Sequence, residues 1–252
     1  MTEDLQKKAA LVTGASSGIG EATVRALRAG GWTVFAVARR AERLAALERE
    51  TGAVAVPADI AEDDDVSRLL AQVTEAGGID TLINIAGGAR GADKVGDANT
   101  ADWEWMYRVN VLGTLKLTRA FLPMLRATGA GTVLNLTSTA GLDAYEGGGG
   151  YNAAKFGQHA MTNALRLEEA EHNVRVIEVA PGLVQTEEFA LNRLGNAQSA
   201  EKVYQGVEKP LTAEDVADVV RYAVSAPHHV NLDQIVVRPV AQAATHKLIR
   251  KG

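Results

Sequence analysis

A glycine-spaced segment near the start constrains the fold of this chain more than any other feature. Gly14, Gly18 and Gly20 directly follow the apolar run at 9–12. Because glycine permits tight turns and close backbone approach, this spacing suits a strand that turns at once into a helix. The N-terminus of such a helix favours negative charge, as on a pyrophosphate. An ordinary glycine-rich turn is the alternative, and the rest of the chain must decide between the two.

Apolar runs alternate with helix-length segments along the whole chain. The predicted strands cover 9–12, 32–38, 54–56, 81–84, 132–136, 174–179 and 235–237, and the predicted helices include 42–50, 64–76, 101–126, 151–171 and 213–225. The strands are apolar throughout, which is typical of a parallel sheet covered on both faces. No linker or repeat divides the 252 residues. We therefore predict a single α/β domain with a doubly wound, Rossmann-type parallel sheet and a ligand site beyond the carboxyl ends of the strands.

Composition narrows the classes of partner. The net charge is -5 with both signs interspersed, which argues against a nucleic-acid surface or a basic membrane patch. The start, Met1-Thr2-Glu3-Asp4, lacks the features of a signal peptide, and no apolar stretch is long enough to span a bilayer, so we expect a cytoplasmic protein with a small-molecule substrate. There is no cysteine, and the five histidines lack helical metal-site spacing, so no metal is expected.

Tyr151 and Lys155 are the candidate residues for proton transfer. A phenol has a pKa near 10, and an ammonium one helical turn away, on the same face, would favour its ionisation. Among five tyrosines, only Tyr151 has a lysine at the fourth following position, although one such pair could arise by chance. Ser138 follows a predicted strand and could hold a substrate oxygen, or it could simply belong to a Ser/Thr turn.

Taken together, these motifs resemble the short-chain dehydrogenase/reductase family over essentially the whole chain. Thr13 to Gly20 is similar to the TGxxxGxG cradle, and 84–87 is similar to the NNAG strand end with Ile85 in place of the second asparagine. The resemblance implies four catalytic positions, Asn110, Ser138, Tyr151 and Lys155, with Asn110 anchoring a water that passes protons to Lys155. It also implies a nicotinamide cofactor. The implied cofactor-binding residues are Gly14, Ser16, Ser17, Gly18, Ile19, Gly20, Arg39, Arg40, Asp59, Ile60, Asn84, Ala86, Gly87, Tyr151, Lys155, Pro181, Gly182, Val184 and Thr186.

The choice between NAD and NADP can be argued from the end of the second predicted strand. NAD sites place an acidic residue there, whereas a 2′-phosphate requires cations. Here Arg39 and Arg40 follow the strand and no carboxylate does, so we predict NADP(H). Arg39 is the favoured phosphate ligand, with Ser16 assisting. Either arginine could instead cap a helix or face solvent.

The last third of the chain resembles the NADP-dependent 3-hydroxy acid dehydrogenase branch, which includes serine 3-dehydrogenases, and its tail is similar to clavulanate-type aldehyde reductases. This implies hydride transfer between NADP(H) and a small polar alcohol or carbonyl, under a substrate lid at about 184–205. A carboxylate substrate would need a cation, for which Arg193 and Arg90 are candidates, although either could be a surface arginine. The glycines at 147–150 could make room for substrate or form a turn.

Two other functions remain open at this stage: general aldehyde or ketone reduction, and NADP binding by a non-catalytic regulator. Family members usually pair through the helices predicted at 101–126 and 151–171, so we expect a homotetramer, with a dimer as the second choice.

Overall fold

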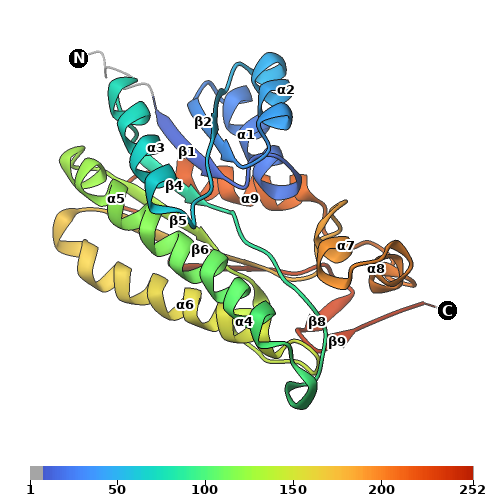
Figure 1. Ribbon diagram of the computed structural model, residues 1–252. Helices are drawn as coiled ribbons and strands as arrows, with labels where there is room; N and C mark the ends of the chain where they lie inside the picture. Colours follow the sequence, from blue (N-terminus) through green and yellow to red (C-terminus); the bar gives the residue numbers. More distant parts are fainter. Residues whose placement is uncertain (1–7, 252) are drawn as a thin grey trace.

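Each predicted apolar run forms a strand of one sheet. The computed structural model describes residues 8–251, and the predicted absence of a leader concerns Met1 to Asp4, which lie outside them. Seven strands pair in parallel in the order β3-β2-β1-β4-β5-β6-β7 (Figure 1). They are β1 (Ala9–Thr13), β2 (Thr33–Ala38), β3 (Val54–Pro57), β4 (Thr81–Asn84), β5 (Thr132–Leu136), β6 (Arg175–Pro181) and β7 (Gln234–Val237). The strand order reverses between β1 and β4, and ligands of doubly wound sheets bind at such a switch point.

Helices cover both faces of this sheet, as predicted. On one face lie α1 (Gly18–Ala29), α2 (Ala41–Thr51) and α9 (Ala213–Ser225); on the other lie α3 (Asp63–Glu75), α4 (Thr100–Tyr107), α5 (Gly113–Ala127) and α6 (Gly149–Glu169). Each covering layer has its own apolar core. Leu27 and Leu44 are fully buried on the first face, and Leu69 and Phe121 are buried on the second. The doubly wound prediction is therefore confirmed.

The helix predicted at 101–126 is interrupted. A π-helical turn at Arg108–Leu112 separates α4 from α5, and Asn110 lies within this turn. Its side-chain amide donates to the carbonyl oxygens of Gly88 (2.9 Å) and Met106 (2.7 Å), while Thr114 Oγ1 donates to the Asn110 carbonyl (2.9 Å). Single π turns inside helices are frequent at functional sites. The hydrophobic periodicity located the helix but could not show this local change of winding.

The chain between β6 and α9 lies beyond the carboxyl ends of the strands. It contains two short helices, α7 (Phe189–Leu194) and α8 (Ala197–Tyr204), within the segment predicted as a lid. After β7, an antiparallel pair, β8 (Gln242–Ala244) with β9 (Lys247–Leu248), lies near α7 and α8 (Figure 1). The short 3-10 turns are Val95–Asp97, Thr139–Gly141 and Ala170–His172. Within the described residues, no helix combines the length and apolar character needed to cross a membrane.

Candidate active site

The glycine segment forms a tight turn between β1 and α1. Gly14 and Gly18 adopt φ values of +69° and +54°, a conformation that L side chains rarely adopt. A Cβ atom on Gly20 would lie 2.2 Å from the Gly14 carbonyl oxygen, and one on Gly18 would lie 3.3 Å from Thr186 Cγ2. The three glycines therefore keep backbone amides exposed at the start of a helix of 12 residues, which suits a diphosphate. This geometry excludes most other residues at these positions.

Thr13 joins this turn to the end of β4. Its Oγ1 accepts hydrogen bonds from the backbone amides of Ile85 and Ala86, each at 2.9 Å. A Cβ atom on Gly14 would approach the Ala86 backbone to 3.1 Å. The side chain of Asn84 lies inside the protein and donates to Asn135 Oδ1 (2.8 Å) and Thr118 Oγ1 (3.2 Å). Asn84 therefore links β4 to β5 and to α5 through its side-chain nitrogen.

The two arginines after β2 point to different partners. Arg40 Nη2 donates to Ser16 Oγ (2.9 Å) and Ser17 Oγ (2.8 Å), so this guanidinium lies against the glycine turn. Arg39 is 68% exposed and lies 3.9 Å from Asp59 Oδ2. The sequence favoured Arg39 with Ser16, but the structure joins Ser16 to Arg40. Side chains of consecutive residues in extended chain point in opposite directions, and the sequence alone could not decide which one faces the turn.

A carboxylate that the sequence analysis missed lies on this arginine cluster. Glu188 Oε1 is 2.7 Å from Arg40 Nη1 and 2.8 Å from Arg43 Nη1. The hydrogen bond from Arg40 is the main reason why the pKa of Glu188 is lowered; a further hydrogen bond involving Ser17 acts in the same direction. The NADP argument considered only residues next to β2, and Glu188 arrives from 148 positions further along the chain. No local signal in the sequence could have revealed this contact.

Asp59 and Ile60, the residues expected to border the adenine, lie in different environments. Asp59 Oδ1 accepts from the Ala61 amide (3.0 Å), and the backbone amide of Asp59 donates to Asp65 Oδ2 (2.7 Å). Ile60 is only 7% exposed, and its side chain packs where a Cβ on Gly113 would lie, at 3.1 Å. Asp59 thus remains accessible, whereas the side chain of Ile60 belongs mainly to the packing between the loop after β3 and α5.

Lys155 is held inside the protein by two acceptors. Its ammonium donates to the Leu136 carbonyl oxygen (3.1 Å) and to Gln158 Oε1 (2.7 Å), and the residue is 4% exposed. Burial lowers the pKa of Lys155 from 10.5 to about 7, and the negative charge of Glu178 opposes this shift. Lys155 can therefore change its protonation state near neutral pH.

Tyr151 lies on the same face of α6, as the spacing predicted. Lys155 Nζ is 5.8 Å from the centroid of the Tyr151 ring. Burial raises the pKa of Tyr151, with a contribution from Tyr145, while Ser138 and the Arg193 guanidinium act in the opposite direction. Burial is thus the largest influence on this pKa, and the opposing influence comes from Ser138 and Arg193 rather than from Lys155. Tyr151 is therefore protonated at neutral pH, which is the form that a proton donor requires.

The other expected residues converge at the ends of β5 and β6. Ser138 Oγ accepts from the Ala140 amide (3.1 Å) and lies 3.4 Å from the Pro181 carbonyl oxygen, to which it can donate. The amide of Gly182 donates to the Val237 carbonyl (2.7 Å), which fixes the chain after β6. Asn110 Oδ1 accepts from the Gly88 amide (3.1 Å), and a Cβ on Gly87 would collide with it at 2.4 Å. After Gly182 the chain continues through Val184, which forms an isolated β-bridge with Leu211. Ile19, at the start of α1, packs against the hydrophobic core beside the glycine turn.

Arg193 enters the site from α7. Its Nε donates to the Gly91 carbonyl (3.1 Å) and its Nη1 to Tyr145 Oη (2.9 Å), and its guanidinium carbon is 6.0 Å from the Tyr151 ring centroid. Arg90 instead stacks at 4.0 Å from the Trp105 ring centroid, with Asp102 Oδ1 3.7 Å away. A small cavity includes both arginines and Tyr151 in its lining. Arg193 is the cation directed toward the candidate proton donor.

The glycine run at 147–150 does not provide open space. A Cβ on Gly148 would lie 2.5 Å from the Tyr145 ring, and one on Gly150 would lie 2.5 Å from Met106 Cε and 2.9 Å from the Trp103 ring. These glycines allow aromatic side chains to pack closely against the start of α6. The second of the two interpretations, a structural turn, fits this packing.

Comparisons with known proteins agree with this arrangement. Residues 8–196 match the family model described as short chain dehydrogenase. Sulfoacetaldehyde reductase 2 of Chromohalobacter salexigens is 37% identical over 92% of this chain and 94% of its own length, and serine 3-dehydrogenase of Agrobacterium fabrum is 35% identical over the same shares. A closed form of serine dehydrogenase complexed with NADP+ has a TM-score of 0.91 and 35% identity, covering 97% of this chain and 100% of the other.

Proposed function

The chain belongs to the short-chain dehydrogenase family and is an NADP-dependent oxidoreductase, and we propose that its substrate is a small polar alcohol or the matching carbonyl, with a 3-hydroxy acid as the first choice. The observation that carries this proposal is the Arg193 guanidinium beside Tyr151. A carboxylate that leaves water must be paired, and this cation is placed to pair it. Serine and sulfoacetaldehyde, named for two relatives, share a short carbon chain with an acidic group.

Proton transfer is assigned to Tyr151. NADPH supplies the hydride to the carbonyl carbon when it is bound. The Tyr151 hydroxyl gives its proton to the carbonyl oxygen, which becomes the alcohol, and the Ser138 hydroxyl donates a hydrogen bond to the same oxygen. The ammonium of Lys155 stabilises the phenolate that remains. Asn110 contributes by holding the loop at 87–88 through its side chain.

The residues fit the phosphates of NADP. The glycine turn offers backbone amides to the diphosphate, and Arg40 with Ser16 and Ser17 forms a polar cluster for the 2′-phosphate. Arg39, which we favoured from the sequence at the end of β2, adjoins Arg40 and can take part through rotation of its exposed side chain. We place Arg40 first because it already contacts the turn.

The segment at 184–205 is proposed to be a lid. The cavity that includes Tyr151 and Arg193 has a volume of about 10 Å³, which is roughly the space of one water molecule. Phe189 of α7 packs edge-on against Tyr151 with ring centroids 5.8 Å apart. Phe189 and Arg193 of α7 both lie against Tyr151, so movement of α7 away from this tyrosine would open space for a substrate. Gly195 has a φ of +74° and ends α7, so it offers one flexible position for such movement.

A substrate panel with a matched pair of variants tests this function. We expect Arg193→Met to raise KM for 3-hydroxy acids about tenfold and to leave KM for neutral aldehydes within about twofold, since a cation that binds both ground and transition states affects KM. Arg90→Met is the control, because Arg90 lines the same cavity but stacks on Trp105, whereas Arg193 lies over the Tyr151 ring. An equal loss for acids and neutral aldehydes would contradict the role of Arg193 in recognising acids.

General carbonyl reduction is the second candidate. Phe189, Trp103 and Met106 give the site an apolar wall that would also accept a neutral substrate. If neutral ketones or aldehydes prove to be the better substrates in the same panel, this alternative replaces the hydroxy-acid proposal.

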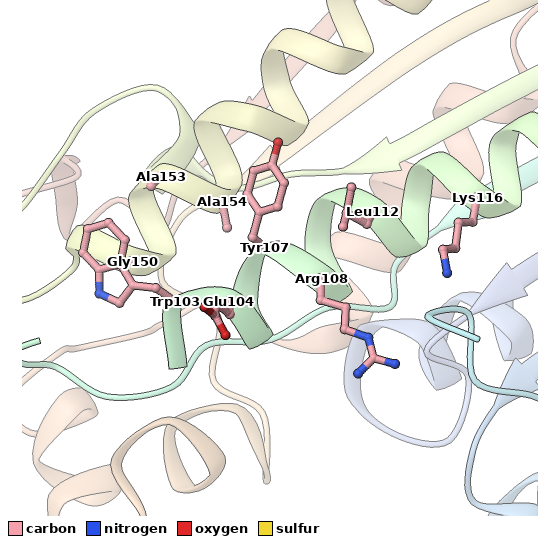
Figure 2. A pocket seen from close by; sticks show the side chains of 9 residues that line it. All are labelled: Trp103, Glu104, Tyr107, Arg108, Leu112, Lys116, Gly150, Ala153 and Ala154. Atoms are coloured by element: carbon pink, nitrogen blue, oxygen red, sulfur yellow. The ribbon is translucent and has the colours of Figure 1, made fainter. Parts of the chain in front are cut away.

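The outer surface of α4, α5 and α6 is proposed to pair with a second copy. It carries a cavity of about 560 Å³ lined by residues that include Trp103, Tyr107 and Leu112 (Figure 2). Tyr107 is 47% exposed and Phe156 is 42% exposed, so two aromatic rings face solvent in the single chain. Burial of such apolar area is favourable, and a homotetramer, or else a dimer, is the expected state. Light scattering of the purified protein tests it, and a monomer would refute it.

A further inference from the structure

Gln158 is a fully buried amide three positions after Lys155 on α6. A buried polar group is costly unless it is hydrogen-bonded, so its partners show why it is tolerated there. Its Oε1 accepts from Lys155 Nζ at 2.7 Å, and its Nε2 donates to Thr114 Oγ1 at 3.4 Å. Gln158 therefore connects the candidate lysine on α6 with α5 on the neighbouring side.

The direction of each hydrogen bond in this connection is determined. An ammonium has only donors, so the oxygen of the Gln158 amide must face Lys155. The amide nitrogen then faces Thr114 Oγ1, which accepts from it and donates its own hydrogen to the Asn110 carbonyl at 2.9 Å. Donors and acceptors alternate along the whole chain of contacts. Lys155 and Asn110 are thus linked on the core side of the site through Gln158 and Thr114.

This linkage limits what the ammonium can do. Lys155 has three hydrogens, and the Leu136 carbonyl and Gln158 Oε1 take two of them. One hydrogen remains for a group in the site. The titratable groups that face Lys155 from its surroundings are Tyr151, a neutral phenol on the same helix, and the carboxylate of Glu178 on β6. Without the Gln158 oxygen, the buried ammonium would keep only the Leu136 carbonyl among these protein acceptors.

We propose that Gln158 is a positioning residue, which fixes the ammonium of Lys155 and keeps it charged so that its one remaining hydrogen points into the active site. This inference rests on the role proposed above for Lys155. Gln158 touches neither Tyr151 nor the glycine turn, so it acts only through Lys155. Because burial has already brought the pKa of Lys155 to about 7, loss of an acceptor changes its charge near neutral pH.

The test follows the titration of Lys155 directly. Full-length protein carrying ¹⁵N-labelled lysine is titrated by NMR without cofactor, and the Lys155 signal is assigned from its absence in Lys155→Met. Gln158→Met keeps the side-chain length and removes the acceptor. The hydrogen bond from Gln158 stabilises the charged form of Lys155. Its loss should therefore lower the titration midpoint of Lys155 by about one pH unit or more. At neutral pH, kcat should fall about tenfold while KM for the carbonyl stays within about threefold.

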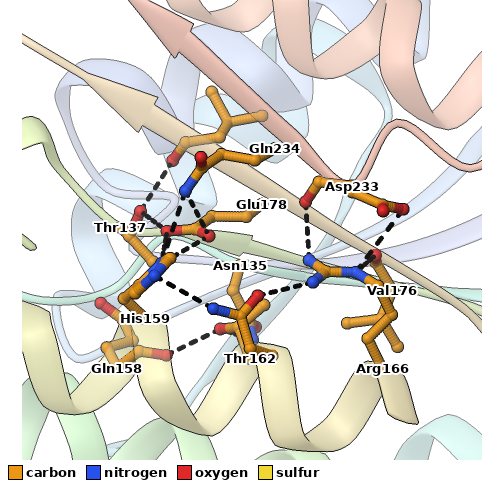
Figure 3. A network of polar contacts seen from close by, with 12 residues as sticks. Asn135, Thr137, Gln158, His159, Thr162, Arg166, Val176, Glu178, Asp233 and Gln234 are labelled. Atoms are coloured by element: carbon orange, nitrogen blue, oxygen red, sulfur yellow. Dashed lines mark hydrogen bonds and ion pairs between the residues drawn. The ribbon is translucent and has the colours of Figure 1, made fainter. Parts of the chain in front are cut away.

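Thr162→Val is the matched control. Thr162 is equally buried, stands one helical turn further along α6 and donates to the Gln158 backbone carbonyl (2.8 Å), as Figure 3 shows. It also accepts from Asn135 Nδ2 (2.9 Å) and has no contact with Lys155. The variant should lower thermal stability without moving the Lys155 midpoint or the pH profile of kcat.

The outcomes separate the possibilities. If Gln158→Met lowers thermal stability but leaves the midpoint and the pH profile as they are in the wild type, Gln158 is only a packing residue and the inference is overturned. If Gln158→Met does not fold, Thr114→Val takes its place, because it removes the acceptor that orients the amide. A smaller fall of the midpoint then supports the inference, and an unchanged midpoint overturns it. Full activity of Lys155→Met would refute the proposed role of Lys155, whereas the NMR result for Gln158 would still stand.

Discussion

The buried ammonium of Lys155 should make the stability of this enzyme depend on pH in a specific way. The residue is 4% exposed, and burial lowers its pKa from 10.5 to about 7. In the unfolded chain, the same side chain is solvated and keeps its ordinary pKa. Folding therefore releases a proton from Lys155 at any pH between these two values. Lys155→Met removes the titration while keeping the length of the side chain.

The sign and size follow from proton linkage. Above about pH 7 the unfolded state binds more protons at this position than the folded state, so stability rises with pH. Below about pH 7 the folded protein carries the buried charge and the destabilisation is fully present. Each pH unit between the two pKa values contributes 1.36 kcal/mol. From about pH 6 to about pH 9, the wild type should gain about 3 kcal/mol of unfolding free energy relative to Lys155→Met.

Urea unfolding followed by circular dichroism measures this difference. Wild type and Lys155→Met are compared at several pH values and at one protein concentration, without cofactor, because ligand binding and assembly both shift apparent stability. Lys202→Met is the control, since Lys202 is exposed on α8 and its replacement should not alter the pH slope. A difference between wild type and Lys155→Met that stays constant across this pH range would refute the reasoning.

Three other substitutions test the site. Tyr151→Phe should abolish at least 99% of turnover, roughly the contribution of one general acid, while NADPH affinity measured by fluorescence stays within a few-fold; substantial remaining activity would disprove the proton-donor role. Arg40→Ala should weaken NADPH binding at least tenfold and NADH binding much less. Arg39→Ala should weaken NADPH binding less than Arg40→Ala does. If Arg39→Ala weakens it more, Arg39 is the main phosphate ligand, as the sequence indicated. Glu188→Gln should tighten NADPH binding about threefold, because its carboxylate competes with a phosphate for Arg40, and unchanged affinity would exclude that competition.

The Glu188 contact lies between the arginine cluster and α7. Glu188 directly precedes α7, the helix that carries Phe189 and Arg193. A phosphate that replaces the Glu188 carboxylate on Arg40 would release the start of this helix. The prediction for Glu188→Gln therefore tests more than cofactor affinity. If the carboxylate restrains α7, the variant should also show faster amide hydrogen exchange in α7 without cofactor.

The relative positions of Tyr151 and Lys155 could be predicted from the sequence, but the pKa of Tyr151 could not. The Tyr151–Lys155 spacing placed both residues on one helical face, and the structure finds them there. The sequence also predicted that the lysine would favour ionisation of Tyr151, whereas in the structure burial raises the pKa of this tyrosine. The extent of burial depends on Phe189 and Arg193, which reach the tyrosine from a distant segment.

The sequence by itself determined the seven strands of the parallel sheet, the approximate places of its covering helices and the glycine turn, because apolar periodicity and the steric freedom of glycine act between residues close in the chain. It did not show the π turn that divides α4 from α5. Only the tertiary structure decided which arginine meets Ser16, that Glu188 lies on Arg40, and that Gln158 joins Lys155 to Thr114. These contacts join side chains from separate elements, and their geometry depends on how the elements pack. The local hydrophobic pattern therefore decides which segments form strands or helices, and tertiary packing decides which of their polar side chains come into contact.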